Sequence, residues 1–288
     1  MPPQAPPEVT LFEVGPRDGL QSRGGMVPAA GKIALIDALS RSGFRRIEAT
    51  SFVSPRWVPQ MADAAEVMAG IVRAPGVRYA ALTPNLTGFE RALAAGCDEV
   101  AVFASASEGF SRANLNCSIE DSFARFAPVL EAARGAGVPV RGYLSMVISC
   151  PFDGPTAPGA VAGWTRRLIE AGCYEVSLGD TIGAGTPDTL EPLLAALLDE
   201  TPPDRLAGHF HDTTGRAAEL VELSLERGLR TFDASVAGLG GCPYAPGARG
   251  NVDTRSVLEV IEAYGLAHGI DLGKLAEAER IAHELTSI

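Results

Sequence analysis

The chain has 288 residues, 46% of them hydrophobic, and its 35 aspartates and glutamates against 24 lysines and arginines give a formal net charge of −11. The acidic charge argues against a nucleic-acid partner, and no apolar run reaches the roughly 18 residues that a membrane span requires. The start of the chain lacks the features of a signal or transit peptide, and its five cysteines have neither disulfide nor zinc spacing, so we expect a cytoplasmic protein with reduced thiols.

Short β-type runs alternate with longer helical patterns along the chain. The predicted strands span residues 9–15, 45–52, 77–83, 98–105, 140–147, 174–180, 206–212 and 230–238. The segments between them, such as 29–43 and 158–172, have apolar residues at helical spacing and end on a glycine typical of a helix C-cap. Eight such units predict an α/β fold of the (β/α)8 TIM-barrel type, because the turn after the first strand lacks the GxGxxG motif of an open doubly wound sheet. We expect residues 1–8 to be a flexible lead-in and residues 9–288 to form one catalytic barrel domain.

Polar residues follow several of the predicted strands, at the barrel end where TIM-barrel active sites lie. They are Arg17, Asp18 and Gln21 after the first strand, Glu48 and Ser51 on the second, Ser177, Asp180 and Thr181 at the sixth, His209 and His211 on the seventh, and Cys242 and Asn251 after the eighth. The last two stand in a Gly-rich loop, "VAGLGGCPYAPGARGN" (236–251). A lone thiol in such a loop is more often retained for reactivity than for packing, so we expect an active-site loop after the eighth strand.

The spacing of His209 and His211 indicates a metal site. Residues i and i+2 of a strand share a face, although the pair alone is equally compatible with one packed and one surface histidine. Because the last strand of a closed barrel pairs with the first, Asp18 and Asn251 fall in the same sector. Two imidazoles, a carboxylate and an amide favour an open catalytic divalent site over a closed structural zinc site, with Mg²⁺, Mn²⁺ or Co²⁺ as the candidate ions.

Several motifs together resemble the 3-hydroxy-3-methylglutaryl-CoA lyases, a family of metal-dependent lyases built on a TIM barrel. These motifs are "EVGPRDGLQ", "SFVSPRWVPQMAD", "LTPNLTGFERALAAG", "NLNCSIEDSFARF", "CYEVSLGDTIGAGTP", "HFHDT" and "GLGGCPYAPGARGN". The resemblance runs in order from about residue 9 to residue 285. The last motif is the most specific, because related condensing enzymes share the Arg-Asp and HxH elements but lack this cysteine loop.

The resemblance implies cleavage of an acyl-CoA substrate, 3-hydroxy-3-methylglutaryl-CoA, to acetoacetate and acetyl-CoA by a homodimer that uses Mg²⁺ or Mn²⁺. The family's metal ligands fall on Asp18, His209, His211 and Asn251, its catalytic arginine on Arg17 and its loop cysteine on Cys242. Its other polar site positions, which touch substrate or support the ligands, fall on Gln21, Glu48, Ser51, Asn114, Ser177, Asp180 and Thr181. The low lysine content with abundant alanine, glycine and arginine suggests a bacterial source, and the resemblance implies a role in leucine catabolism and ketone-body formation.

The chemistry of a reverse Claisen cleavage suits these residues. Either Asp18 or His209 can serve as the base that takes the hydroxyl proton, and the sequence leaves that choice open. Arg17 is placed to stabilise the enolate of acetyl-CoA, and Cys242, with a thiol pKa near about 8.5, can return a proton to it. Citramalyl-CoA or a longer branched 3-hydroxyglutaryl-CoA is the alternative substrate, and a non-catalytic barrel that binds metal and CoA is the alternative class.

Overall fold

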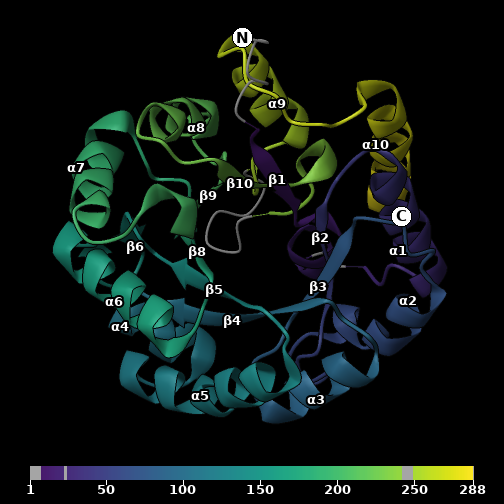
Figure 1. Ribbon diagram of the computed structural model, residues 1–288, viewed down its shortest axis with the longest axis horizontal. Coiled ribbons are helices and arrows are strands. Elements are labelled where there is room, and N and C mark those ends of the chain that lie inside the picture. Colours follow the sequence, from purple (N-terminus) through teal and green to yellow (C-terminus); the bar gives the residue numbers. More distant parts are fainter. Residues whose placement is uncertain (1–7, 23–24, 242–248, 288) are drawn as a thin grey trace, which may run out of the picture.

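The computed structural model describes residues 8–22, 25–241 and 249–287, and eight of its strands close into a parallel barrel (Figure 1). Around the barrel these are β1 (Thr10–Glu13), β10 (Thr231–Ala234), β9 (Leu206–Phe210), β8 (Glu175–Asp180), β5 (Val140–Ser145), β4 (Glu99–Ser105), β3 (Arg78–Leu82) and β2 (Arg46–Ser51). Each lies inside a range predicted from the sequence, and β1 pairs with β10 as closure requires. The predicted (β/α)8 barrel is therefore confirmed.

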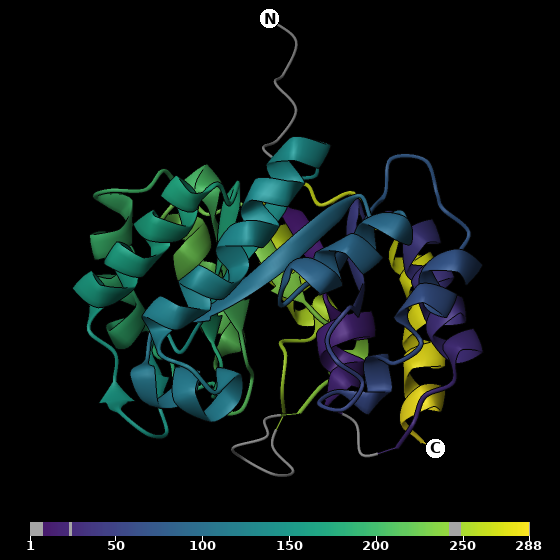
Figure 2. The same ribbon diagram turned by 90° about the horizontal axis from the view of Figure 1, so that it is seen from below.

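Helices cover the outside of the barrel (Figure 1). They are α1 (Ala29–Arg41), α2 (Ala64–Gly70), α3 (Leu86–Ala94), α4 (Glu108–Phe110), α5 (Ile119–Ala136), α6 (Pro158–Ala171), α7 (Pro187–Leu198), α8 (Ala217–Glu226), α9 (Thr254–Ala263) and α10 (Leu272–Thr286). Helix α10 packs against α1 and carries the C-terminal end of the described chain (Figure 2). Within the described residues, no helix combines the length and the apolar character that crossing a membrane demands.

Glycines end the helices where the sequence predicts C-caps. Gly43 after α1 has a φ of 100° and Gly172 after α6 has a φ of 117°, in the left-handed region that favours glycine. A Cβ atom at Gly43 would also collide with the backbone carbonyl of Gly269, in the segment before α10. Position 43 therefore requires glycine both for its conformation and for the close approach of the chain leading into α10.

The interior of the barrel differs from the apolar interior usual in this fold. The outward-facing side of the strands packs with the helices in one large hydrophobic cluster. Charged side chains fill much of the inside, and Glu48, Glu99, Arg141, Glu175 and Asp233 are all buried. Arg141 pairs with Glu175 and Asp233, whereas Glu99 pairs with Arg46 and Glu48 with Arg17. The interior of the barrel therefore presents a network of paired charges to the catalytic end.

A hairpin and the start of the chain stand outside the regular alternation of barrel strands and helices. A short hairpin of β6 (Ser149–Cys150) and β7 (Gly154–Pro155) stands between β5 and α6, and its two-residue strands are too brief to produce a sequence pattern. The lead-in expected over residues 1–8 lies outside the described residues, except for Glu8, which forms an isolated parallel bridge with Ala267.

Candidate active site

The turn after β1 carries the first two predicted site residues. Gly15–Gly19 forms a single π-helical turn, from which Arg17 and Asp18 both project. Such turns are rare and recur at functional sites. The carboxylate of Glu13 accepts the first N–H of the turn at 2.9 Å and the N–H of Val236, just after β10, also at 2.9 Å. Glu13 therefore ties this turn to the start of the Gly-rich loop region.

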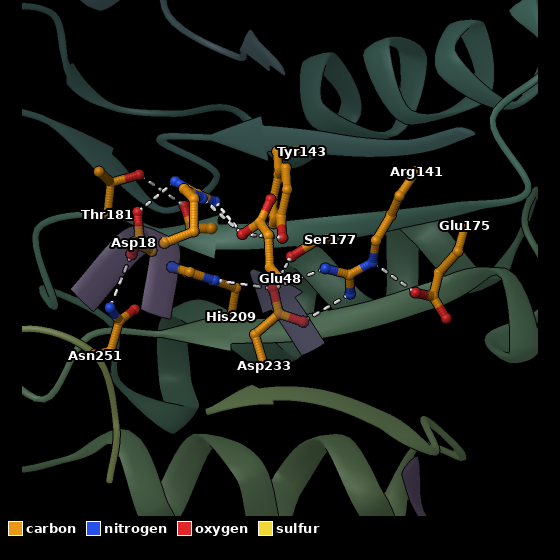
Figure 3. A network of polar contacts seen from close by, with 12 residues as sticks. Asp18, Glu48, Arg141, Tyr143, Glu175, Ser177, Thr181, His209, Asp233 and Asn251 are labelled. Carbon is orange, nitrogen blue, oxygen red and sulfur yellow. Dashed lines mark hydrogen bonds and ion pairs between the residues drawn. The ribbon is translucent and has the colours of Figure 1, made fainter. Parts of the chain in front are cut away.

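Asp18, His209 and His211 form a compact cluster at the C-terminal end of the barrel. Their ligand-capable atoms all lie within 4.8 Å of one another, and the two imidazole centroids are 5.4 Å apart. Asn251 forms an isolated bridge with His211, and its Nδ2 donates to Oδ2 of Asp18 at 2.8 Å (Figure 3). The structure thus brings together the four residues that barrel closure predicts.

This cluster fits a divalent cation. Nδ1 of His211 is buried and has no hydrogen-bond partner, which costs free energy unless a ligand engages it. Burial, followed by the positive charge of His209, lowers the pKa of His211 to about 4, so this imidazole is neutral at pH 7. Burial alone would raise the pKa of Asp18, but the charges of Arg17 and His209 hold it below its usual value. A neutral imidazole therefore lies beside an ionised carboxylate, as nitrogen and oxygen ligation of a divalent ion requires.

Arg17 is a fixed positive charge at the edge of the cluster. Its Nε and one terminal nitrogen each lie 2.6 Å from Oε2 of Glu48, and the other terminal nitrogen lies 2.7 Å from Oδ1 of Asp18. Its guanidinium carbon is 5.2 Å from the ring centroid of Tyr143. Burial opposes the charge, but Glu48 and Asp18 outweigh it and raise the pKa of Arg17 above its ordinary value. The guanidinium is thus cationic and held on two sides.

Glu48 supports this arginine from beneath. It is fully buried on β2, and its Oε2 also accepts the hydroxyl of Tyr143 at 3.0 Å. Burial raises the pKa of Glu48 in spite of the neighbouring Arg17. Its Oε1 is buried without a hydrogen-bond partner. Glu48 therefore orients Arg17 with one oxygen and keeps the other unpaired.

Three predicted site residues lie on β8 or directly after it. Ser177 donates to the carboxylate of Asp233 at 2.7 Å. Asp180 accepts two backbone N–H groups of the loop before α7, at 2.8 and 3.2 Å. The hydroxyl of Thr181 accepts the N–H of Met146 at 3.1 Å. Of the three, Ser177 is joined to the histidine cluster through Asp233, whereas Asp180 and Thr181 hold neighbouring loops through these hydrogen bonds.

The remaining predicted residues within the described chain lie on β2, after the π-helical turn and before α5. Ser51 is buried at the end of β2, and its hydroxyl donates to the carbonyl of Leu82 at 3.3 Å. Gln21 is half-buried after the π-helical turn, and Asn114 is exposed before α5. Cys242 lies outside the described residues, so its role stays a prediction.

Besides Glu13, the prediction from sequence missed three buried polar residues that support the site. Arg141 and Tyr143 stand on β5 and Asp233 on β10, all inside strands rather than at their ends. A signal did exist, because a charged residue in the middle of a barrel strand must face either the helices or the interior. Because the helices that cover the barrel have apolar faces, the charged side chain is expected to face the interior. This pattern does not identify the residue with which it pairs.

The barrel and the cluster at its catalytic end define a (β/α)8-barrel protein with a candidate divalent-metal site. The chain belongs to the HMGL-like family, whose profile matches residues 8–282.

Three relatives illustrate the similarity. The 3-hydroxy-3-isohexenylglutaryl-CoA/hydroxy-methylglutaryl-CoA lyase of Pseudomonas aeruginosa is 56% identical over 273 residues, which are 95% of this chain and 91% of that protein. The crystal structure of the HMG-CoA lyase of Brucella melitensis superposes with a TM-score of 0.96 at 56% identity and covers 98% of this chain and 100% of its own. An HMG-CoA lyase of Acinetobacter baumannii, in complex with coenzyme A and 3-methylmalate, has a TM-score of 0.91 at 37% identity and covers 97% of this chain and 92% of its own.

Proposed function

We propose that this chain is a lyase that cleaves 3-hydroxy-3-methylglutaryl-CoA to acetoacetate and acetyl-CoA. The observation that carries the proposal is the cluster of Asp18, His209 and His211 with the Arg17 guanidinium 2.7 Å from Asp18. The identity of 56% to lyases of two bacteria supports it over nearly the whole chain. In the reaction a base takes the tertiary hydroxyl proton, the C2–C3 bond breaks, and its electron pair passes to the thioester as an enolate.

We assign Asp18, His209, His211 and Asn251 as the ligands of Mg²⁺ or Mn²⁺. A bound divalent cation supplies Lewis acidity, which makes a hydroxyl that it contacts more acidic and orients the substrate. The chain contributes one ionised carboxylate, two imidazoles and a neutral amide, so the ligand set carries a single negative charge.

We assign the base to Asp18 rather than His209. Nδ1 of His209 is paired with Asp233 at 2.9 Å, so Nε2 is the nitrogen left for ligation, and a ligating nitrogen cannot also accept a proton. In spite of its burial, Asp18 has a pKa held below the usual value by Arg17, and it is therefore ionised at neutral pH. An ionised carboxylate beside the reacting hydroxyl can take its proton.

Arg17 has the charge and the rigidity to stabilise the enolate. Negative charge reaches the thioester oxygen only as the C2–C3 bond breaks, so a preorganised cation there lowers the barrier rather than the energy of the bound substrate. Glu48 and Asp18 hold the guanidinium at 2.6 and 2.7 Å, so little reorganisation is needed at the moment of reaction.

We assign the final proton transfer, to the enolate carbon, to Cys242. Alkylation of the protein with iodoacetamide should then abolish turnover, and substrate should protect it. Peptide mapping of the modified protein should place the inactivating label on Cys242. The Cys242→Ser variant should lose most of kcat, because a hydroxyl is a far weaker acid than a thiol, and should keep its Mn²⁺ affinity. Alkylation of Cys97 or Cys173 with the same loss of activity would remove Cys242 from this role.

The other residues predicted from the sequence complete the proposal. We place Gln21, Glu48, Ser51, Asn114, Ser177, Asp180 and Thr181 around the substrate or behind the ligands and Arg17. We further propose that residues 9–288 act as one catalytic domain, that the protein works as a cytoplasmic bacterial homodimer, and that it serves leucine catabolism and ketone-body formation.

A second substrate class is kept because of one observation. The name of the Pseudomonas aeruginosa relative covers a 3-hydroxy-3-isohexenylglutaryl-CoA substrate as well as the hydroxymethylglutaryl one. A longer branched 3-hydroxyglutaryl-CoA undergoes the same bond cleavage, since its branch replaces only the methyl group on C3 and leaves the tertiary hydroxyl and the C2–C3 bond in place. Citramalyl-CoA differs more, but it presents the same tertiary hydroxyl.

The experiment that tests the function is an acyl-CoA panel. The purified protein is assayed for acetyl-CoA release from each of the three thioesters, with Mg²⁺, with Mn²⁺ and after treatment with EDTA. We expect the highest kcat/KM for 3-hydroxy-3-methylglutaryl-CoA, loss of activity in EDTA and recovery with either ion. A higher value for another thioester would establish the alternative substrate. Metal binding without any cleavage would indicate the non-catalytic barrel.

A further inference from the structure

Asp233 lies directly beneath the proposed metal site. Its carboxylate on β10 is 2% exposed and accepts four hydrogen bonds. Oδ2 accepts from Nδ1 of His209 at 2.9 Å, from Ser177 at 2.7 Å and from Arg141 at 3.0 Å, and Oδ1 accepts from Arg141 at 2.7 Å. The carboxylate is therefore saturated with donors, one of which is the histidine ring.

The bond to Asp233 decides which nitrogen His209 presents. Because a carboxylate accepts, Nδ1 carries a proton, and Nε2 is the nitrogen that can give up its proton and ligate a metal ion. Histidine ligands of metal ions commonly donate their second ring N–H to a carboxylate in this way, which fixes the tautomer and increases the basicity of the ligating nitrogen. His211 has no such partner for its Nδ1. The two histidines are therefore not equivalent.

A column of buried charge holds Asp233 in place. Arg141 is fully buried, grips Asp233 with two nitrogens and donates from its Nε to Glu175 at 2.7 Å. Arg46 extends the column by donating a hydrogen bond to Glu175 at 3.1 Å. Figure 3 shows the resulting order, with Glu175 at one end, Arg141 and Asp233 between, and His209 at the end nearest Asp18. This column reaches from the interior of the barrel to the cluster. Because desolvated charges are costly unless they are paired, each pair in the column helps to keep its neighbours in place.

We propose that Asp233 is a positioning residue that fixes the tautomer and orientation of His209 for ligation, with Arg141 and Ser177 holding its carboxylate. The inference rests on the proposed function, because it takes His209 as a metal ligand. Asp233 does not touch the substrate in this role and acts through the histidine alone.

The test is Mn²⁺ binding by Asp233→Asn, measured by electron paramagnetic resonance without substrate. An amide at this position either turns its NH₂ toward the donors of Arg141 or donates to Nδ1 and moves the histidine proton to Nε2. Both results disturb ligation, so the dissociation constant should rise by about 10- to 100-fold, the usual range for loss of such a partner. At saturating Mn²⁺, the fraction of wild-type activity that the variant recovers should be smaller than the fraction of its sites that hold Mn²⁺.

Glu175→Gln is the matched control. Glu175 is buried in the same column and pairs with the same arginine, but its ion pairs are with Arg141 and Arg46 and not with His209. Both variants should unfold at lower temperature without metal, whereas only Asp233→Asn should lose Mn²⁺ affinity. Equal loss in the two variants would overturn the positioning role, and so would wild-type affinity in Asp233→Asn. A wild-type protein that binds no Mn²⁺ would instead overturn the metal site itself.

Two further measurements apply even where Asp233→Asn does not fold. Ser177→Ala removes one of the four donors to Asp233, and a loss of Mn²⁺ affinity of several-fold is expected from it. In the Mg²⁺-loaded wild type, the ¹⁵N NMR signals of His209 should show a protonated Nδ1, and the chain contains only four histidines to assign. A proton on Nε2 of His209 would overturn the proposal without any variant.

Discussion

Arg17→Met is expected to lower kcat by at least about 10²- to 10³-fold, the usual scale for losing one preorganised donor to a developing oxyanion. Methionine preserves much of the side-chain length but removes the charge and both fixed contacts, to Glu48 and to Asp18. KM should change by less than about threefold, because the metal and the CoA portion still hold the substrate. Steady-state kinetics on 3-hydroxy-3-methylglutaryl-CoA separates the two constants.

Arg17→Lys is the conservative comparison. A lysine ammonium cannot reproduce the planar donor fork that contacts Glu48 and Asp18 together, so it should restore only a small part of kcat. Mn²⁺ affinity of both variants should stay close to wild type, which separates a catalytic loss from a damaged metal site. If Arg17→Met kept a near-normal kcat and only raised KM, Arg17 would be a binding residue and the enolate mechanism would be wrong.

The strands could be predicted because they depend on local pattern, and the four candidate ligands because they depend on local pattern together with closure of the barrel. Alternation of β-type runs with amphipathic segments locates the strands, and every barrel strand lies inside its predicted range. The i, i+2 spacing of His209 and His211 gives a shared face, and closure of the barrel adds Asp18 and Asn251. The contact of Asn251 with Asp18 joins residues 233 positions apart in the sequence, yet topology alone anticipates it.

The support beneath the ligands could not be predicted in the same way. The pair of Arg141 and Asp233 spans 92 positions and lies across the inside of the barrel, not between neighbouring strand ends. Predicting this pair requires knowing which side of each strand faces the interior and how far along the barrel axis each residue lies. A shift of register by one residue moves the side chain to the opposite face of the strand. The π-helical turn at Gly15–Gly19 also has no periodic signal, since it is one turn long.

Asp18→Asn should affect the protein more broadly than any other single change, because Asp18 is both a proposed ligand and the proposed base. The amide keeps the size of the side chain but removes the negative charge next to Arg17 and the two histidines. Mn²⁺ affinity should fall by more than the roughly 10- to 100-fold typical of a supporting residue. At sub-saturating metal, kcat/KM should fall by at least about 10³-fold, since loss of a positioned base alone costs about 10²- to 10⁴-fold.

Titration with Mn²⁺ separates the two roles of Asp18. High Mn²⁺ should refill the site of Asp18→Asn, as measured by electron paramagnetic resonance, while turnover stays low because an amide cannot take the hydroxyl proton. Asp212→Asn is the control: Asp212 follows His211 in the sequence and pairs with Arg249 at 3.0 Å at the surface, so its loss should leave Mn²⁺ affinity unchanged. Turnover that returns fully with metal occupancy would make Asp18 a ligand only and return the base to another residue. Unchanged Mn²⁺ affinity in Asp18→Asn would exclude it from the ligand set, because an ionised carboxylate contributes more to the binding of a divalent ion than any neutral member of the cluster.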